Sequence, residues 1–317
     1  MERSIKGVNV CVIGGAGFLG SHLVDYLIDE RGCNVLVLDN LITGQKRFVN
    51  PKATFIWTDI THSEEQVRRI FLQYKTEYVF NYAAEPYIPV SFARPLHVFD
   101  INARGALMVM NAAQEAGVKA VLLVSSAEIY GDVDGKIKET DQARPHSTYG
   151  ASKLAIDMLV QSRWKEAKSP VIALRQFNCL GERETHENVV PVIIEQISNG
   201  TIVKLGNNSF RDFQYAGDAV RMAVELLEKG QFGEVYNMGS EDGIKIYDLA
   251  ELIGKLMNVK VEVQEDPARI RPWEIWHLQS DNTKLYSVIK TRPRVLLEEG
   301  LKKTIEWFKA NGNKWDF

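Results

Sequence analysis

Residues 8–21, VNVCVIGGAGFLGS, determine how the rest of this chain is organised. Residues 8–13 are apolar and rich in β-branched side chains, as in a short buried strand. Gly14, Gly17 and Gly20 follow with the spacing G-x-x-G-x-x-G, and a helical apolar period begins directly after them. The glycines allow a tight turn and a close approach of the backbone to a pyrophosphate, which the N–H groups at the helix N-terminus can bind. The segment therefore predicts a dinucleotide site, against the alternative of a tight turn that binds nothing.

An acidic residue after the second predicted strand indicates which dinucleotide binds. Residues 34–38 form that strand, and Asp39 follows it, about 20 residues after Gly20. A carboxylate at this point can accept hydrogen bonds from both hydroxyls of an adenosine ribose, and it repels a 2′-phosphate. We therefore expect NAD rather than NADP.

Composition and charge narrow the class of protein. The 317 residues are 45% hydrophobic and 25% charged, with a net charge of −3, as in an ordinary globular protein. No basic run points to nucleic acid or an anionic membrane surface, and no apolar run is long enough to span a bilayer. Cys11, Cys33 and Cys179 are widely spaced, without a Cys/His cluster. We expect reduced thiols, no metal, no nucleic-acid or membrane partner, and a cytoplasmic location.

Strand and helix patterns alternate over the first half of the chain. Strands are predicted at 8–13, 34–38, 54–57, 77–81, 120–125 and 170–174, and helices at 20–30, 63–73, 97–116 and 149–167. This alternation predicts βαβ units and hence an α/β fold, a Rossmann-type doubly wound parallel sheet. We assign residues 1–175 to this NAD-binding domain. Residues 176–317 are assigned to a smaller C-terminal α/β domain that binds the substrate and is interleaved with the first.

Ligands of parallel sheets bind beyond the carboxyl ends of the strands, so residues directly after strands are candidates for the site. Asp59 could bind an adenine amino group, although it could equally cap a loop. Ala83 and Ala84 are small enough for a cofactor to lie against the backbone. Ser126 and Glu128 place a hydroxyl and a carboxylate at the end of the strand predicted at 120–125.

Tyr149 and Lys153 open a predicted helix four residues apart, so they share one helical face. A nearby ammonium stabilises a phenolate and lowers the pKa of a tyrosine, which can then take a proton from a sugar hydroxyl. The pair alone is a weak motif, and most such pairs lie on an exposed helix face. The dinucleotide motif, and Ser126 as a partner for the substrate hydroxyl, favour the catalytic interpretation.

Together these motifs resemble the extended short-chain dehydrogenase/reductase family, and within it the NAD-dependent nucleotide-sugar epimerases and dehydratases. The resemblance covers essentially the whole chain. It rests on the segments GGAGFLGS, DNL, DI, NYAAE, SSAEIYG, YGASK, RQFNCLG, RDFQYAGDAV, YNMGS and RIRPWE, together with Asn102 and Gly105.

The resemblance implies roles for particular residues. Cofactor binding would involve Gly14, Gly17, Phe18, Leu19, Gly20, Asp39, Asn40, Asp59, Ile60, Ala83, Ala84, Asn102, Tyr149 and Lys153. Catalysis would involve Ser126, Glu128, Tyr149 and Lys153. The substrate, a nucleotide diphosphate sugar such as a UDP- or GDP-hexose, would contact Glu85, Ser125, Asn178, Arg211 and Arg271. Family members commonly form homodimers through the helices predicted here at 97–116 and 149–167.

Ala127 and Glu128 bear on the type of reaction. Oxidation of a hexose at C4 makes the C5 proton acidic, and a carboxylate in the site can remove it before water leaves from C6. An epimerase needs no such group, so Glu128 favours a 4,6-dehydratase. Ala127 stands where many dehydratases of the family carry an aspartate that protonates the leaving hydroxyl, so Glu128 or a water would have to supply that proton.

Other functions stay open at this point. A UDP-hexose 4-epimerase with an unusual Glu128 is the main alternative. A UDP-glucuronate decarboxylase would also carry a glutamate here, but the segment AAEPYIPVSF offers no distinctive basic residue for a sugar carboxylate. A regulator that binds NAD without catalysis is the non-enzymatic alternative, which Ser126, Tyr149 and Lys153 argue against.

Overall fold

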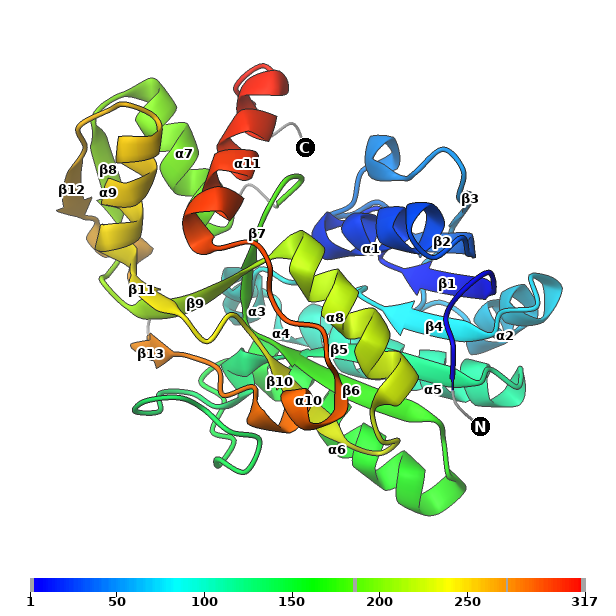
Figure 1. Cartoon of the computed structure of the whole chain (residues 1–317). Coiled ribbons are helices and arrows are strands. Elements are labelled where there is room, and N and C mark those ends of the chain that lie inside the picture. The colour runs from blue at the N-terminus through cyan, green and yellow to red at the C-terminus, as the bar shows by residue number, and fades with distance from the viewer. Residues whose placement is uncertain (1–2, 185–186, 272, 315–317) are drawn as a thin grey trace.

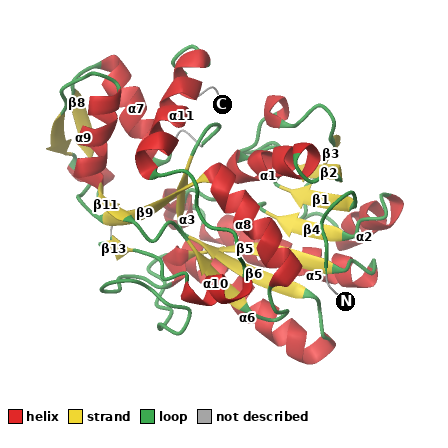
Figure 2. Cartoon of the chain, in the orientation of Figure 1, coloured by secondary structure: helices red, strands yellow, loops and turns green. Residues whose placement is uncertain are grey.

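The structure, a computed structural model, describes residues 3–184, 187–271 and 273–314. Its centre is a seven-stranded sheet whose neighbouring strands all pair in parallel (Figure 2). The strands lie in the order β10-β6-β5-β4-β1-β2-β3. Their bounds are β1 Asn9–Ile13, β2 Asn34–Asp39, β3 Thr54–Trp57, β4 Tyr78–Asn81, β5 Ala120–Ser126, β6 Val171–Gln176 and β10 Val235–Met238. The predicted Rossmann-type doubly wound sheet is confirmed.

Helices cover both faces of this sheet (Figure 1). One face packs on α1 Phe18–Asp29 and α8 Ala216–Lys229, and the other on α2 Glu64–Gln73, α5 Gly105–Glu115 and α6 Thr148–Ala167. Side chains alternate between the two faces along β1: Val12 joins the first core and Cys11 the second. Because both faces are buried, the strands read as continuous apolar runs.

The helix termini follow from local side-chain chemistry. Ser63 accepts a hydrogen bond from the Gln66 amide at 3.2 Å and caps α2, and Ser147 accepts one from the Gly150 amide at 3.0 Å and caps α6. The helix predicted at 97–116 is three consecutive pieces, α4 Pro95–Phe99, a π-helical turn η2 Asp100–Arg104, and α5. A short helix, α3 Ile88–Ala93, was not predicted, because its proline lies within a segment that reads as a loop.

The C-terminal half of the chain contributes to the large sheet. After residue 176 the chain forms α8, which packs on the same face as α1, and then β10, which pairs with β6 at the sheet edge. The strand β10 therefore extends the first sheet, and α10 Thr283–Val288 adds Leu285 to the same core.

The remaining segments form a smaller lobe around β9 Phe210–Tyr215 (upper left in Figure 1). It pairs with β7 Asn178–Leu180 and β13 His277–Leu278 in parallel and with β11 Gly243–Lys245 antiparallel, while β8 Ile202–Leu205 pairs with β12 Glu262–Glu265. The helices α7 Val189–Asn199, α9 Ile246–Leu256 and α11 Leu297–Ala310 enclose its core. No helix within the described ranges is long and apolar enough to cross a membrane.

Candidate active site

A cavity of about 670 Å³ lies where the carboxyl ends of the parallel strands meet the smaller lobe. It brings together nearly all the residues that the sequence predicted for the site. Those lining it are Gly14, Gly17, Phe18, Leu19, Gly20, Asp39, Asn40, Asp59, Ile60, Ala83, Ala84, Glu85, Ser125, Ser126, Glu128, Tyr149, Lys153, Asn178, Arg211 and Arg271. Asn102 is the one predicted site residue that does not line it.

The glycine turn between β1 and α1 is shaped by close backbone contacts. Gly14 has φ +76°, and a Cβ there would lie 2.6 Å from the Ala83 nitrogen. A Cβ at Gly20 would collide with the Gly14 carbonyl oxygen. Neither position can carry a side chain, so the turn leaves an open cradle at the N-terminus of α1.

Asp39 ends β2 and is bound to the glycine turn. Its carboxylate accepts hydrogen bonds from the Ala16 amide at 3.0 Å and from the Leu41 amide at 2.8 Å. Burial raises the pKa of Asp39, and these two hydrogen bonds oppose the rise. Each carboxylate oxygen has a second lone pair, so the group can still accept hydrogen bonds from a ligand in the cavity.

Asn40 and Asp59 are linked at the same edge of the cavity. The Asn40 amide donates to Asp59 at 3.0 Å, and the Thr61 hydroxyl and backbone N–H donate to the other carboxylate oxygen at 2.6 and 2.8 Å. These three hydrogen bonds outweigh partial burial and lower the pKa of Asp59. Asp59 therefore orders its own loop in addition to lining the cavity.

Tyr149 and Lys153 lie at the start of α6, opposite the end of β5. The Lys153 ammonium donates to the Val124 carbonyl oxygen at 2.9 Å and lies 5.8 Å from the centre of the Tyr149 ring. The Ser126 hydroxyl shares a hydrogen bond with the Tyr149 phenol. The three side chains thus face one point of the cavity.

The expected lowering of the Tyr149 pKa is absent here. Burial raises the pKa of Tyr149 to about 12, and the nearby carboxylates of Glu128 and Glu85 act in the same direction. Burial also lowers the pKa of Lys153 to about 8, although Asp157 opposes this. The ammonium is bound to a backbone carbonyl rather than to the phenol, so it does not tune the tyrosine in this arrangement.

Two predicted ligand residues instead hold the site together. Asn102 is 1% exposed; its oxygen accepts from the Glu85 amide at 2.9 Å, and its amide donates to the Ser152 hydroxyl at 3.1 Å. The Ser125 hydroxyl donates to the Lys153 carbonyl oxygen at 3.1 Å. Asn102 therefore positions Glu85 and α6 from behind the cavity, and Ser125 anchors α6 although it also lines the cavity.

Glu128 follows β5 in a short 3-10 turn, η3 Ala127–Ile129. The Ser126 hydroxyl caps this turn, because it accepts a hydrogen bond from the backbone N–H of Glu128 at 3.2 Å. One carboxylate oxygen of Glu128 lies 4.0 Å from an Arg271 guanidinium nitrogen. Burial raises the pKa of Glu128, and Arg271 and then Arg211 oppose this most strongly. The structure thus places a carboxylate with increased proton affinity beside Ser126 and Tyr149.

Arg211 projects from β9 and is paired with Glu274, to which sequence reasoning assigned no role. The guanidinium lies 3.2 Å from one Glu274 oxygen, and the Asn207 amide donates to the other at 2.6 Å. Glu274 belongs to the RIRPWE segment that carries Arg271, but its pairing with β9 is a tertiary contact without a local pattern.

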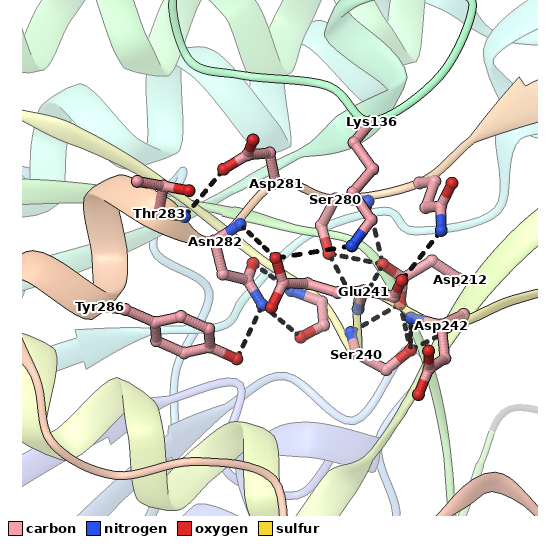
Figure 3. A network of polar contacts seen from close by, with 12 residues as sticks. Lys136, Asp212, Ser240, Glu241, Asp242, Ser280, Asp281, Asn282, Thr283 and Tyr286 are labelled. Carbon is pink, nitrogen blue, oxygen red and sulfur yellow. Dashed lines mark hydrogen bonds and ion pairs between the residues drawn. The ribbon is translucent and has the colours of Figure 1, made fainter.

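Asp212, next to Arg211, anchors β9 (Figure 3). Its fully buried carboxylate accepts hydrogen bonds from the Ser240 hydroxyl at 2.7 Å, the Ser240 amide at 2.6 Å and the Ser280 amide at 2.9 Å. The Glu241 amide and the Ser280 hydroxyl also donate to it. Three separate segments are thereby joined directly behind Arg211.

Three buried polar atoms in residues lining the cavity have no hydrogen-bond partner in the described part of the chain. They are the Tyr82 hydroxyl, the Gln176 amide oxygen and one carboxyl oxygen of Glu184. Burial holds the pKa of Glu184 well above its usual range. Such atoms are costly to bury unpaired, so they fit a polar ligand better than an empty cavity. With the glycine cradle, they fit a dinucleotide and a second polar ligand; the sequence contained no signal for Glu184.

Metal chemistry has no candidate site, since the described residues contain no group of three or more His, Cys, Asp or Glu side chains able to hold an ion. The cavity instead collects hydroxyls, carboxylates, one lysine and three arginines.

Comparisons with known proteins agree on the family to which this chain belongs. The model of the NAD dependent epimerase/dehydratase family matches residues 10–239. A dTDP-D-glucose 4,6-dehydratase from Mus musculus is 31% identical, over 96% of this chain and 90% of the mouse protein. The solved UDP-glucose 4-epimerase of Thermotoga maritima, with UDP-glucose, is 32% identical over 96% of this chain and 99% of its own, with a TM-score of 0.90. The solved UDP-glucose 4-epimerase of Thermus thermophilus, in complex with NAD, is 30% identical. The match covers 95% of this chain and 99% of the Thermus chain, with a TM-score of 0.88. This chain therefore belongs to the NAD-dependent epimerase/dehydratase family.

Proposed function

We propose that this protein is a nucleotide-sugar 4,6-dehydratase. The enzyme uses NAD, and its family comprises nucleotide-sugar dehydratases and epimerases. The observation that carries the finer proposal is the position of Glu128, a largely buried carboxylate in the same cavity as Ser126, Tyr149 and Lys153. A 4-epimerase has no use for a base at C5.

Binding is assigned to two parts of the cavity. The cradle of Gly14, Gly17 and Gly20 would take the NAD pyrophosphate, and Asp39 the adenosine ribose. The other predicted cofactor residues that line the cavity, Phe18, Leu19, Asn40, Asp59, Ile60, Ala83 and Ala84, would contact the same ligand.

The substrate would lie toward the smaller lobe. Arg211 and Arg271 supply the cations that a diphosphate requires, and Asn178 lies at the start of β7 with its side chain available to the same group. Glu85 would contact the sugar.

The oxidation step uses Tyr149 as base. NAD, when bound, accepts a hydride from the sugar and later returns it. Tyr149 must first be present as its phenolate, which the positive charge of Lys153 would stabilise. The phenolate then takes the proton of the C4 hydroxyl and becomes a phenol, while Ser126 hydrogen-bonds to the same substrate oxygen. In the structure the Lys153 ammonium is bound to Val124, so it must exchange that partner in part to stabilise the phenolate.

The dehydration step uses Glu128. The C4 ketone makes the C5 proton acidic, Glu128 removes it, and the electron pair left on C5 expels the C6 hydroxyl, which leaves as water on protonation. Ala127, 2% exposed, lines the cavity but has no proton to give. Glu128 would therefore pass on the proton it has just taken.

A 4-epimerase is the second candidate, because two of the solved structures similar to this chain are UDP-glucose 4-epimerases. In that reaction the 4-keto sugar rotates, and the hydride returns to its other face. Ser126, Tyr149 and Lys153 would act in the same way, but Glu128 would have no proton to move.

A comparison of Glu128→Gln with Glu128→Asp tests the assignment. Each NAD-loaded variant is mixed with dTDP-glucose, UDP-glucose and GDP-mannose. UDP and GDP are the nucleotides expected from the sequence, and dTDP-glucose is the substrate named for the mouse relative. We expect Glu128→Gln to form reduced cofactor, seen by its absorbance, without loss of water, and Glu128→Asp to retain part of the dehydration. Equal loss of cofactor reduction and dehydration in Glu128→Gln would make Glu128 a structural residue.

A further inference from the structure

Both arginines proposed to bind the diphosphate are paired with carboxylates of the protein itself. Arg211 lies 3.2 Å from Glu274, and Arg271 lies 4.0 Å from Glu128. All four side chains line the same cavity. A nucleotide diphosphate that enters it would therefore compete with two internal anions for two cations.

The two pairs differ in how firmly they are held. Glu274 also accepts hydrogen bonds from the Asn207 amide at 2.6 Å and from the Ile275 amide at 3.2 Å, and its side chain is only 6% exposed. Glu128 has Arg271 as its single cation within ion-pair distance among the described residues. Arg271 is 34% exposed, against 8% for Arg211. The Arg271–Glu128 pair is the longer and more open of the two, and therefore the easier to break.

On the basis of the proposed function, we propose that Arg271 changes partners when a nucleotide diphosphate binds. Its guanidinium leaves the Glu128 carboxylate for the diphosphate oxygens, and Glu128 thereby becomes a stronger base. Arg271 would then serve both to bind the substrate and to activate the base, so that Glu128 becomes fully basic only when a sugar is present to react.

The groups around Glu128 all support this direction of change. In the structure, burial raises the pKa of Glu128, and the opposing influences are Arg271, Arg211 and, more weakly, His146. Glu274 acts with burial. A diphosphate that binds both arginines neutralises the two largest opposing charges and brings negative charge closer. Tyr149, on the remaining side, is a neutral phenol at ordinary pH.

Proton uptake on binding is the direct consequence. A carboxylate that loses a cationic neighbour gains about 1 or more in pKa, which corresponds to an uptake of roughly half a proton per site near the midpoint. The phosphates of a sugar diphosphate are diesters without a proton to exchange near neutral pH, so an uptake must come from the protein.

Calorimetry on NAD-loaded Tyr149→Phe protein tests this without turnover. dTDP-glucose, UDP-glucose and GDP-mannose are titrated in, and the one that binds is studied in buffers of different ionisation enthalpy. The slope of binding heat against buffer enthalpy gives the protons taken up. The measurement is repeated over the acidic and neutral pH range, and we expect roughly half a proton per site at the pH where the uptake is largest.

Three further variants, each in the Tyr149→Phe background, identify the group that takes up the proton. Glu128→Gln should abolish the uptake while the sugar nucleotide still binds. Arg271→Gln, in which Glu128 has already lost its cation, should reduce the uptake by half or more. His146→Asn, the matched control for the other titratable side chain, should leave it unchanged.

The outcomes separate this inference from the proposed function. Binding without proton uptake, or uptake unaffected by Glu128→Gln or by Arg271→Gln, overturns the exchange of partners and leaves the dehydratase assignment standing. Failure of all three sugar nucleotides to bind contradicts the proposed function itself.

Discussion

The Lys153 ammonium donates a hydrogen bond to the backbone oxygen of Val124 at 2.9 Å, and its nitrogen lies 5.8 Å from the centre of the Tyr149 ring. The proposed catalytic pair therefore lies on one helical face without direct contact between its two polar groups. Because the phenol is buried and its pKa is raised to about 12, Tyr149 is protonated until further positive charge reaches it.

Tyr149→Phe should remove most turnover, because the hydroxyl proton of the sugar then has no acceptor. A loss of about 100-fold or more in kcat is expected for a missing general base. Binding of NAD and of the sugar nucleotide, measured by calorimetry, should stay within a few-fold of wild type. Turnover within a few-fold of wild type would refute Tyr149 as the base.

The pH dependence of stability should report the burial of Lys153. Its pKa is 10.5 when unperturbed and about 8 in the folded protein, so between these values the unfolded chain binds more protons. The contribution of Lys153 to stability therefore rises with pH over this window. In NAD-free protein, urea unfolding should show wild type gaining at least about 1 kcal/mol relative to Lys153→Met between pH 8 and pH 10. A constant difference would mean that Lys153 titrates normally.

The part of the fold that is encoded in local patterns was predictable. The strand predicted at 34–38 is β2 Asn34–Asp39. It could be predicted because a short apolar run between polar residues is the usual pattern of a buried strand. The placement of β10 beside β6 was not predictable, since strand order depends on contacts between segments far apart in sequence. The helix α3 was missed because prolines at 86 and 89 also indicate a loop.

The sequence predicted which residues line the site better than it predicted which residues contact one another there. Residues after strand ends do line one cavity, since the carboxyl ends of parallel strands share an edge. Asn102 was assigned to the cofactor, but it lies behind Glu85 and Ser152 instead. The pairing of Glu274 with Arg211 joins a loop to strand β9, and no periodicity encodes the approach of these two segments.

Asp39 should decide between the two dinucleotides. Its carboxylate ends β2 at the edge of the cavity, where a 2′-phosphate would meet negative charge. Calorimetry should give NAD a large advantage over NADP in wild type, and Asp39→Ser should reduce the NAD-to-NADP affinity ratio about 10-fold or more. The ratio corrects for any general weakening of the turn that Asp39 anchors. An unchanged ratio would remove Asp39 from cofactor selection.

A homodimer is expected through α6 and the helix predicted at 97–116, which the structure forms as α4, η2 and α5. Leu96 is 82% exposed and Phe99 43% exposed on α4, and Met158 is 49% exposed on the adjacent α6. Light scattering should give twice the chain mass, and Leu96→Asp with Met158→Lys should shift it to one chain mass. Ile202→Lys, a matched change of an exposed apolar residue on β8, should leave the mass unchanged. A wild-type monomer would contradict the expectation.

The product formed by the NAD-loaded wild-type enzyme tests the central claim most directly. dTDP-glucose, UDP-glucose and GDP-mannose are each incubated in D2O, and the products are analysed by mass spectrometry and proton NMR. A 4,6-dehydratase converts at least one of them into a 4-keto-6-deoxy sugar that has lost one water and carries solvent deuterium at C5, because the original C5 proton leaves with the water and Glu128 takes up a solvent deuteron before C5 is protonated again. A product that retains all its oxygen atoms and differs only in the configuration at C4 would contradict the account.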